Sequence, residues 1–170
     1  GQTLPLLKRG IPVELVHMEN TPFGDTFKGL KVLVMSYSNM KPMEPRYHDF
    51  LADWVRKGGA LIYCGEDIDP YQSVLEWWNS NGNQYKAPSE HLFEKLGLGR
   101  VPAAGTYPCG KGMVTVIRED PKHFVLKSGN DRQYFDAVSA AYRKSAGKEV
   151  ELKNSCLLYT SDAADDLTRV

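Results

Sequence analysis

Two short apolar runs joined by an amphipathic segment constrain the fold of this chain more than any other feature. One run lies within Lys31–Tyr37, and the other is Ala60–Cys64. An unbroken apolar run between turns is typical of a strand that is buried on both faces of a parallel sheet. Glu44–Lys57 lies between them, and its apolar side chains recur at helical spacing: Tyr47, Phe50, Leu51, Trp54 and Val55. The pattern therefore predicts two parallel strands joined by a helix in a right-handed crossover.

Weaker patterns on both sides of this unit predict further elements. Helices are expected over Leu4–Arg9, Ser73–Trp78, Ser89–Leu96 and Asp131–Lys144, and strands over Pro12–His17 and Met113–Glu119. Asp69 is placed to cap the second of these helices, and the glycine-rich stretch Tyr107–Gly112 predicts a turn. A last strand is expected to begin at Val150–Leu152. This alternation predicts an α/β domain with a parallel sheet in three αβα layers.

The composition is that of an ordinary globular domain. Of the 170 residues, 42% are hydrophobic, which is enough for one sizeable core. The chain has 21 basic and 21 acidic residues, and no apolar run reaches the roughly 18 residues that a membrane span needs. We therefore expect neither a nucleic-acid partner nor a membrane span. The cysteines show no Cys-x-x-Cys spacing, which disfavours a disulfide framework or zinc site and favours a reducing compartment such as the cytoplasm.

The final residues differ in kind from the rest of the sequence. Cys156–Asp166 reads Cys-Leu-Leu-Tyr-Thr-Ser-Asp-Ala-Ala-Asp-Asp, and these eleven residues look like the translation of a transposase adapter used in short-read sequencing. We therefore expect residues 1–155 to form the domain and residues 156–170 to be a non-native tail. The tail holds three aspartates and one arginine, so the remainder carries 20 basic and 18 acidic side chains, a formal charge of +2. The chain starts at glycine inside a helix-like segment, so we expect the natural N-terminus to lie upstream.

The loop after the second buried strand is where an open α/β sheet would hold a catalytic or binding site. Cys64 ends that strand at a glycine turn, an arrangement similar to a nucleophile elbow. Such a cysteine needs a histidine base, and His17 and His123 are the best placed, although neither belongs to a recognisable motif. The simpler interpretation of Cys64 is a buried, inert thiol.

Three carboxylates follow in the same loop, from Glu66, Asp67 and Asp69. Divalent cations such as Ca²⁺ and Mg²⁺ prefer clustered carboxylate oxygens, so these side chains are candidates for a cation site. Their spacing matches no known metal-binding loop, and Asp69 already has a structural role as a helix cap. We therefore expect no metal and no other cofactor.

Aromatic side chains in the following segment could stack on sugar rings. The candidates are Trp77 and Trp78, with Tyr71 nearby. Adjacent residues on a helix point about 100° apart, so both tryptophans cannot line one face equally. We expect one tryptophan in the core and the other at a contact surface.

Three segments of the chain together resemble one family. They read Arg9-Gly-Ile-Pro-Val-Glu-Leu-Val16, Leu30-Lys-Val-Leu-Val34 and Val55-Arg-Lys-Gly-Gly-Ala-Leu-Ile62. In this order they are similar to the trimerisation domain that follows the catalytic barrel in β-galactosidase-type glycoside hydrolases, a member of the class I glutamine-amidotransferase-like superfamily. The similarity covers about Leu4 to Gly65. It implies a flavodoxin-like, doubly wound parallel sheet that is incomplete at both ends and lacks its first strand.

The resemblance also implies a function. In the family the hydrolytic carboxylates lie on a preceding barrel, and this domain contributes to subunit contacts. We therefore predict a non-catalytic accessory or oligomerisation domain of a glycoside hydrolase, active in carbohydrate metabolism, whose partners are other domains of the parent chain and further copies. The amidotransferase branch has a cysteine near the position of Cys64, but its His and Glu partners are not recognisable here. Two alternatives stay open: an amidotransferase-like hydrolase that uses Cys64, and a carbohydrate-binding module that uses Trp77 or Trp78.

Overall fold

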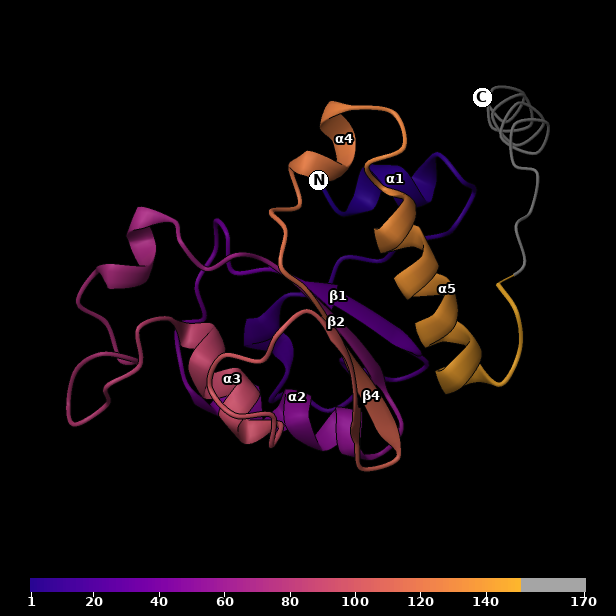
Figure 1. Ribbon diagram of the computed structural model, residues 1–170. Coiled ribbons are helices and arrows are strands. Elements are labelled where there is room, and N and C mark those ends of the chain that lie inside the picture. The colour runs from indigo at the N-terminus through magenta and orange to yellow at the C-terminus, as the bar shows by residue number, and fades with distance from the viewer. Residues whose placement is uncertain (151–170) are drawn as a thin grey trace, which may run out of the picture.

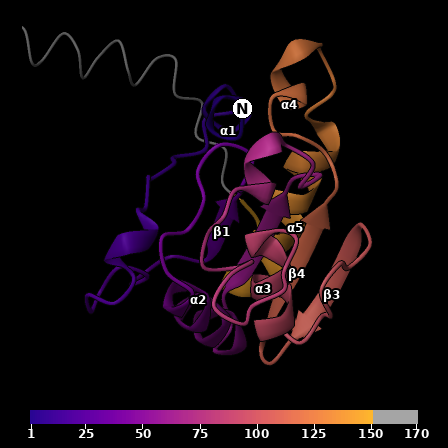
Figure 2. The ribbon, with the colours of Figure 1, turned by 90° about the vertical axis from the view of Figure 1, so that its left-hand side faces the viewer.

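A sheet of four strands forms the centre of the computed structural model, which describes residues 1–150. β1 (Val32–Met35) lies at one edge, followed across the sheet by β2 (Ala60–Cys64), β4 (Gly112–Ile117) and β3 (Gly105–Cys109). β1, β2 and β4 run parallel to one another, and β3 is antiparallel to β4. β1 and β3 are therefore the two edge strands, and Figure 2 shows β4 and α3 between them. The chain therefore has an α/β fold with a mixed, mostly parallel sheet.

Helices cover both faces of the sheet (Figure 1). α2 (Arg46–Arg56) and α3 (Pro88–Lys95) lie on one face and bury their apolar side chains against β2 and β4. α1 (Thr3–Leu7) and α5 (Arg132–Ala146) lie on the opposite face. The short α4 (His123–Leu126) precedes α5 in the chain and contacts α1. Among residues 1–150, no helix combines the length and the apolar character needed to cross a membrane.

The strand–helix–strand unit predicted from the two apolar runs is confirmed. β1 and β2 pair in parallel, with Val32 opposite Ala60, and α2 connects them. Gly59 follows α2 at a point where a Cβ atom would lie 2.5 Å from the ring of Trp54, so a larger residue there would require the Trp54 side chain to move. Every residue of β2 is buried, as its unbroken apolar run predicts, whereas β1 is fully buried only at Met35.

The prediction of a wholly parallel sheet is wrong at the far edge. The sequence predicts a turn over Tyr107–Gly112, but the first half of this stretch belongs to β3, which forms a hairpin with β4. Pro108 hides this strand from sequence patterns, because proline lacks an N–H group and is tolerated in sheets mainly at edges. Gly110 makes the tight turn with a φ of +58°.

The predicted strand Pro12–His17 is also wrong. Residues 11–17 pair with no strand in the described part of the chain, and an apolar groove separates them from β1. The alternation is kept only at the start of the segment: Ile11 and Val13 pack toward the face covered by α1 and α5, but Leu15, two residues further on, is 79% exposed. The segment has the pattern of a strand but no neighbour to supply the backbone hydrogen bonds.

The predicted helix Ser73–Trp78 does not form either. Asp69 caps a helical turn as predicted, but that turn is a single 3₁₀ segment, η2 (Pro70–Ser73). Val74 is extended, with a ψ of 148°, and the side-chain amide of Asn79 donates to its carbonyl oxygen at 2.7 Å. Asparagine competes with the helical backbone in this way, so turns replace the helix.

The other predicted helices and strands lie within two residues of their expected ends. The short elements η1 (Met18–Asn20) and α4 were not predicted. Two predictions fall outside the described residues: the strand Val150–Leu152 beyond its first residue, and the tail at 156–170.

Candidate functional site

The carboxyl ends of β1 and β2 lie side by side, at the edge of the sheet where open α/β folds hold their sites. The loops that follow, residues 38–45 and 65–75, are called here the carboxyl-edge loops. The Lys41 ammonium donates to Oδ1 of Asp69 at 2.9 Å, and these side chains are only 11% and 22% exposed. Gln72 Nε2 also donates to the carbonyl oxygen of Tyr37 at 3.4 Å. These contacts join the two loops into one surface.

A second ion pair, between Arg118 and Asp67, joins the segments that follow β4 and β2. Oδ2 of Asp67 accepts hydrogen bonds from Arg118 at 2.9 Å and from the Ser89 hydroxyl at 2.8 Å, and its Oδ1 accepts from the Tyr63 hydroxyl. The backbone of Asp67 has a φ of +59°, which few residues other than glycine adopt and which aspartate tolerates better than most. Asp67 thus ties β2, the start of α3 and the end of β4 together, with both carboxylate oxygens engaged.

The three carboxylates considered for a cation do not gather into one site. Arg118 and Lys41 pair with Asp67 and Asp69, and the Glu66 residue is exposed. Within residues 1–150 there is no group of three His, Cys, Asp or Glu side chains that could hold a metal ion. The acidic loop therefore serves to hold strands and loops together.

Cys64 lies in the core beneath α1 and α5 and is fully buried. Burial raises the pKa of its thiol to about 12, although an interaction with the Gln2 side chain opposes part of this rise. Neither His17 nor His123 hydrogen-bonds to it in the described part of the chain. A thiol with this pKa stays protonated near neutral pH, so the position carries no thiolate nucleophile.

A buried chain of hydrogen bonds near the carboxyl end of β1 has no counterpart in the sequence predictions. The Tyr37 hydroxyl lies 2.6 Å from Nε2 of His48, and Nδ1 of His48 lies 2.8 Å from Nδ1 of His91. Burial, with smaller effects from His91 and Lys95, lowers the pKa of His48 to about 3. Burial also lowers the pKa of His91, which is half-buried. Both rings are therefore neutral near pH 7, and Tyr37 can donate to His48, which donates in turn to His91.

Aromatic rings surround this histidine pair. Trp77 meets His48 and His91 edge to face at centroid distances of 5.8 and 5.2 Å, and Tyr85 meets His91 at 5.3 Å. In the described part of the molecule, none of these hydrogen bonds runs from a histidine to a carboxylate. They join Tyr37 to His48 on α2 and His48 to His91 on α3, and so hold α2 against α3. One sequence signal could have indicated it: His48 follows Tyr47 on the apolar arc of α2.

The prediction that one of the two adjacent tryptophans lies in the core is confirmed. Trp78 is 1% exposed, and its indole N–H donates to the carbonyl oxygen of Gln72 at 2.9 Å, so it offers no face to a sugar. Trp77 is half-buried and donates to the carbonyl oxygen of Pro42 at 2.8 Å. Tyr71 is 62% exposed. Of these three candidates, Tyr71 and part of Trp77 are therefore open to solvent.

The carboxyl-edge loops present apolar side chains to solvent. Six large apolar residues on them are more than 40% exposed: Met40, Met43, Ile68, Tyr71, Val74 and Leu75. Grouped exposed apolar residues are typical of surfaces that contact another protein. Two charged groups of the same loops, Lys41 and Asp69, pair with each other and are largely shielded, whereas Glu66 is exposed.

The arrangement joins chain segments and offers an apolar contact surface, and within residues 1–150 the Cys64 thiol at the sheet edge is buried and protonated. Comparisons of the chain with models of protein families, with curated proteins and with solved structures found no match.

Proposed function

We propose that the chain is a flavodoxin-like, non-catalytic accessory domain of a β-galactosidase-type glycoside hydrolase, and that it makes contacts between copies of the protein. The resemblance that suggests this role runs through the segments that build β1, α2 and β2. An α/β sheet with helices on both faces is compatible with such a domain.

One observation carries the proposal. The carboxyl edge of the sheet, where enzymes of this architecture keep their reactive groups, carries exposed Met40, Met43, Ile68 and Leu75 and a shielded Lys41–Asp69 ion pair. Such a surface is suited to burial against another protein surface. A substrate site would instead be expected to combine a concave pocket with a few free polar groups.

Sedimentation velocity over a range of protein concentrations tests this role. We expect self-association that is lost when Ile68→Asp and Leu75→Asp place two charges on the carboxyl-edge loops. The matched control is Val101→Asp with Leu126→Asp, which changes residues of similar exposure, 72% and 66%, elsewhere on the surface. A wild-type chain that stays monomeric throughout, or equal losses in both double variants, would contradict the proposal.

Sugar binding remains a second candidate because Tyr71 is 62% exposed and Trp77 is half-buried beside the same loops. An oligosaccharide that stacks on Trp77 should change the tryptophan fluorescence in a saturable way, and Tyr71→Ala should weaken the response. Fluorescence that is unchanged at millimolar oligosaccharide would exclude this candidate while leaving the accessory role intact.

A further inference from the structure

β1 is the outermost strand of the sheet on its side, and half of its backbone groups face away from β2. The carbonyl oxygen of Lys31 accepts a hydrogen bond from the N–H of Ala60 at 3.1 Å. Because the direction of the backbone groups alternates along a strand, those of Leu33 also point to β2, and those of Val32 and Val34 point outward. The apolar sequence of β1 is that of an interior strand, yet in the described chain it lies at an edge.

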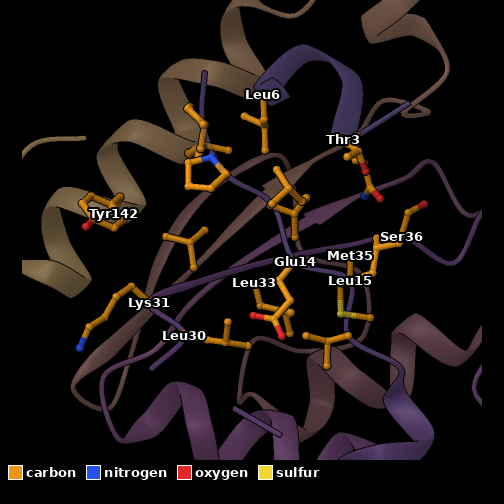
Figure 3. A pocket seen from close by; sticks show the side chains of 18 of the residues that line it. Thr3, Leu6, Glu14, Leu15, Leu30, Lys31, Leu33, Met35, Ser36 and Tyr142 are labelled. Atoms are coloured by element: carbon orange, nitrogen blue, oxygen red, sulfur yellow. The ribbon is translucent and has the colours of Figure 1, made fainter. Parts of the chain in front are cut away.

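An apolar groove of about 1200 Å³ runs along this free edge. That volume exceeds the roughly 300–1,000 Å³ of a typical small-molecule site. β1 forms one wall and residues 11–17 form the other. Figure 3 shows Leu6 of α1, Tyr142 of α5, Leu33 of β1 and Leu15 among the side chains that line the groove. The groove therefore separates two extended segments that lie along the same edge of the fold.

The handedness of the fold indicates which segment fits between these walls. Crossovers between parallel strands are right-handed in nearly all proteins, so helices on opposite faces of a sheet carry the chain across it in opposite directions. α2 carries the chain from β1 to β2, and α1 lies on the other face and leads directly into residues 11–17. A strand that precedes α1 therefore belongs on the β1 side of residues 11–17, which is the position of the groove.

The start of α1 also fixes the direction of such a strand. A Cβ atom on Gly1 would lie 2.4 Å from the carbonyl oxygen of Pro121, so Gly1 packs just beyond the carboxyl end of β4. The Tyr134 hydroxyl holds the carbonyl oxygen of Gln2 at 2.9 Å. A strand that enters α1 at this point ends at the carboxyl edge of the sheet, and so it runs parallel to β1.

We propose that the groove receives a β-strand, parallel to β1, from a segment that enters α1 from its N-terminal side. This strand bonds to Val32 and Val34 on one side, and residues 11–17 become the new edge strand on the other. Leu33 packs toward the face of α2, and Val32 and Val34 pack toward the face of α1 and α5, so the inserted strand carries apolar side chains on both faces. A strand after α5 could also reach this edge, but it would lie two strands away from β4, and consecutive strands are usually neighbours.

Hydrogen exchange on an extended chain tests the proposal. An extension of about six valine and isoleucine residues, the length of a typical strand, is joined ahead of Gly1 by a short flexible linker. We expect amide exchange at Val32 and Val34, followed by NMR, to slow by about 100-fold or more as these groups gain partners. The amides of Leu33 and Met35, which already face β2, are the internal reference.

Two matched chains make the outcome decisive. In one, prolines replace alternate residues of the same extension and remove its N–H donors, so protection at Val32 and Val34 should be absent. In the other, the apolar extension is placed after Val150 of a chain ended there. The proposal is overturned if the N-terminal extension leaves these amides unprotected or unfolds the chain, or if only the C-terminal extension protects them. Protection that rises with protein concentration in the unextended chain would assign the edge to a second copy and overturn it equally.

Discussion

Gly112 begins β4 at the point where the backbone of two other segments comes closest to it. A Cβ atom there would lie 2.1 Å from the carbonyl oxygen of Val55 and 2.2 Å from that of Gly59. Neither oxygen can rotate away, because both belong to the backbone. Gly112→Ala should therefore lower the free energy of unfolding by about 2–3 kcal/mol, measured by urea denaturation.

Gly129→Ala is the matched control for this substitution. Gly129 has a φ of +87° and no atom near the place of a Cβ, so alanine there introduces backbone strain alone. Its cost should be about 1 kcal/mol. Equal losses for the two variants would show that close approach of the backbone does not constrain Gly112.

Cys64 allows a direct test of the amidotransferase alternative. With a pKa of about 12, only about one thiol in ten thousand is ionised at pH 8. We expect Cys64 to resist iodoacetamide in the folded protein and to react fully in urea, with peptide mass spectrometry locating the label. Rapid, stoichiometric alkylation of Cys64 in the folded chain would revive that alternative.

Among the elements, β2, α3 and β4 meet at the carboxylate of Asp67. Asp67→Ala removes three hydrogen bonds and leaves the guanidinium of Arg118, whose side chain is 22% exposed, without its partner. We expect a loss of about 2–4 kcal/mol in the free energy of unfolding. Asp67→Asn should cost less, since asparagine tolerates a positive φ and still accepts hydrogen bonds.

The control is an ion pair that joins no separate elements. Asp53 contacts Lys57 at 2.6 Å within one helical turn, and these side chains are 60% and 75% exposed. Asp53→Ala should change the free energy of unfolding by less than about 0.5 kcal/mol. Similar losses at Asp53 and Asp67 would mean that the junction does not depend on its carboxylate.

Elements whose own residues show a regular apolar pattern were the predictable ones. The apolar runs of β1 and β2 and the helical spacing of α2 carry their own signal. β3 was missed because Pro108 masks a strand that depends on its hairpin partner. The strand predicted over Pro12–His17 failed for the opposite reason, because a strand pattern without a neighbour forms no ladder.

In the candidate site, too, the features with a local sequence pattern could be predicted and the contacts between distant residues could not. The carboxyl ends of β1 and β2 were located from the order of the elements, and the burial of Cys64 followed from its place at the end of an apolar run. The contact between His48 and His91 joins residues 43 positions apart. Only the packing of α2 on α3 brings them together, and no local pattern encodes it.

For the whole molecule, the buried histidine pair predicts how stability depends on pH. His48 has a pKa of about 3 in the folded chain, against about 6.5 when unfolded. Below about pH 6.5 the unfolded chain binds a proton that the folded chain does not, so stability falls as the pH falls. Between pH 7.5 and 5 we expect urea denaturation to show a loss of about 2 kcal/mol from His48. His91, whose pKa is also lowered, adds to the loss.

The slope of this pH dependence identifies its source. His48→Gln should flatten the fall in stability between pH 6.5 and 5, whatever its effect at pH 7.5. The matched control is His17→Gln, which removes an exposed histidine outside this pair. An unaltered slope in His48→Gln would mean that the histidine pair is not buried as neutral rings.

The two helical layers differ in the sequence separation of their helices. The layer of α2 and α3 comes from one continuous stretch together with β1 and β2, whereas the opposite layer needs α1 and α5 from both ends of the described chain. Arg9 pairs with Asp131 across 122 positions to join them. Contacts between distant segments form late, because closing long loops costs entropy. During synthesis on the ribosome, one face of the sheet can therefore be covered early, while the other stays bare until α5 emerges and is the face that a chaperone would have to shield.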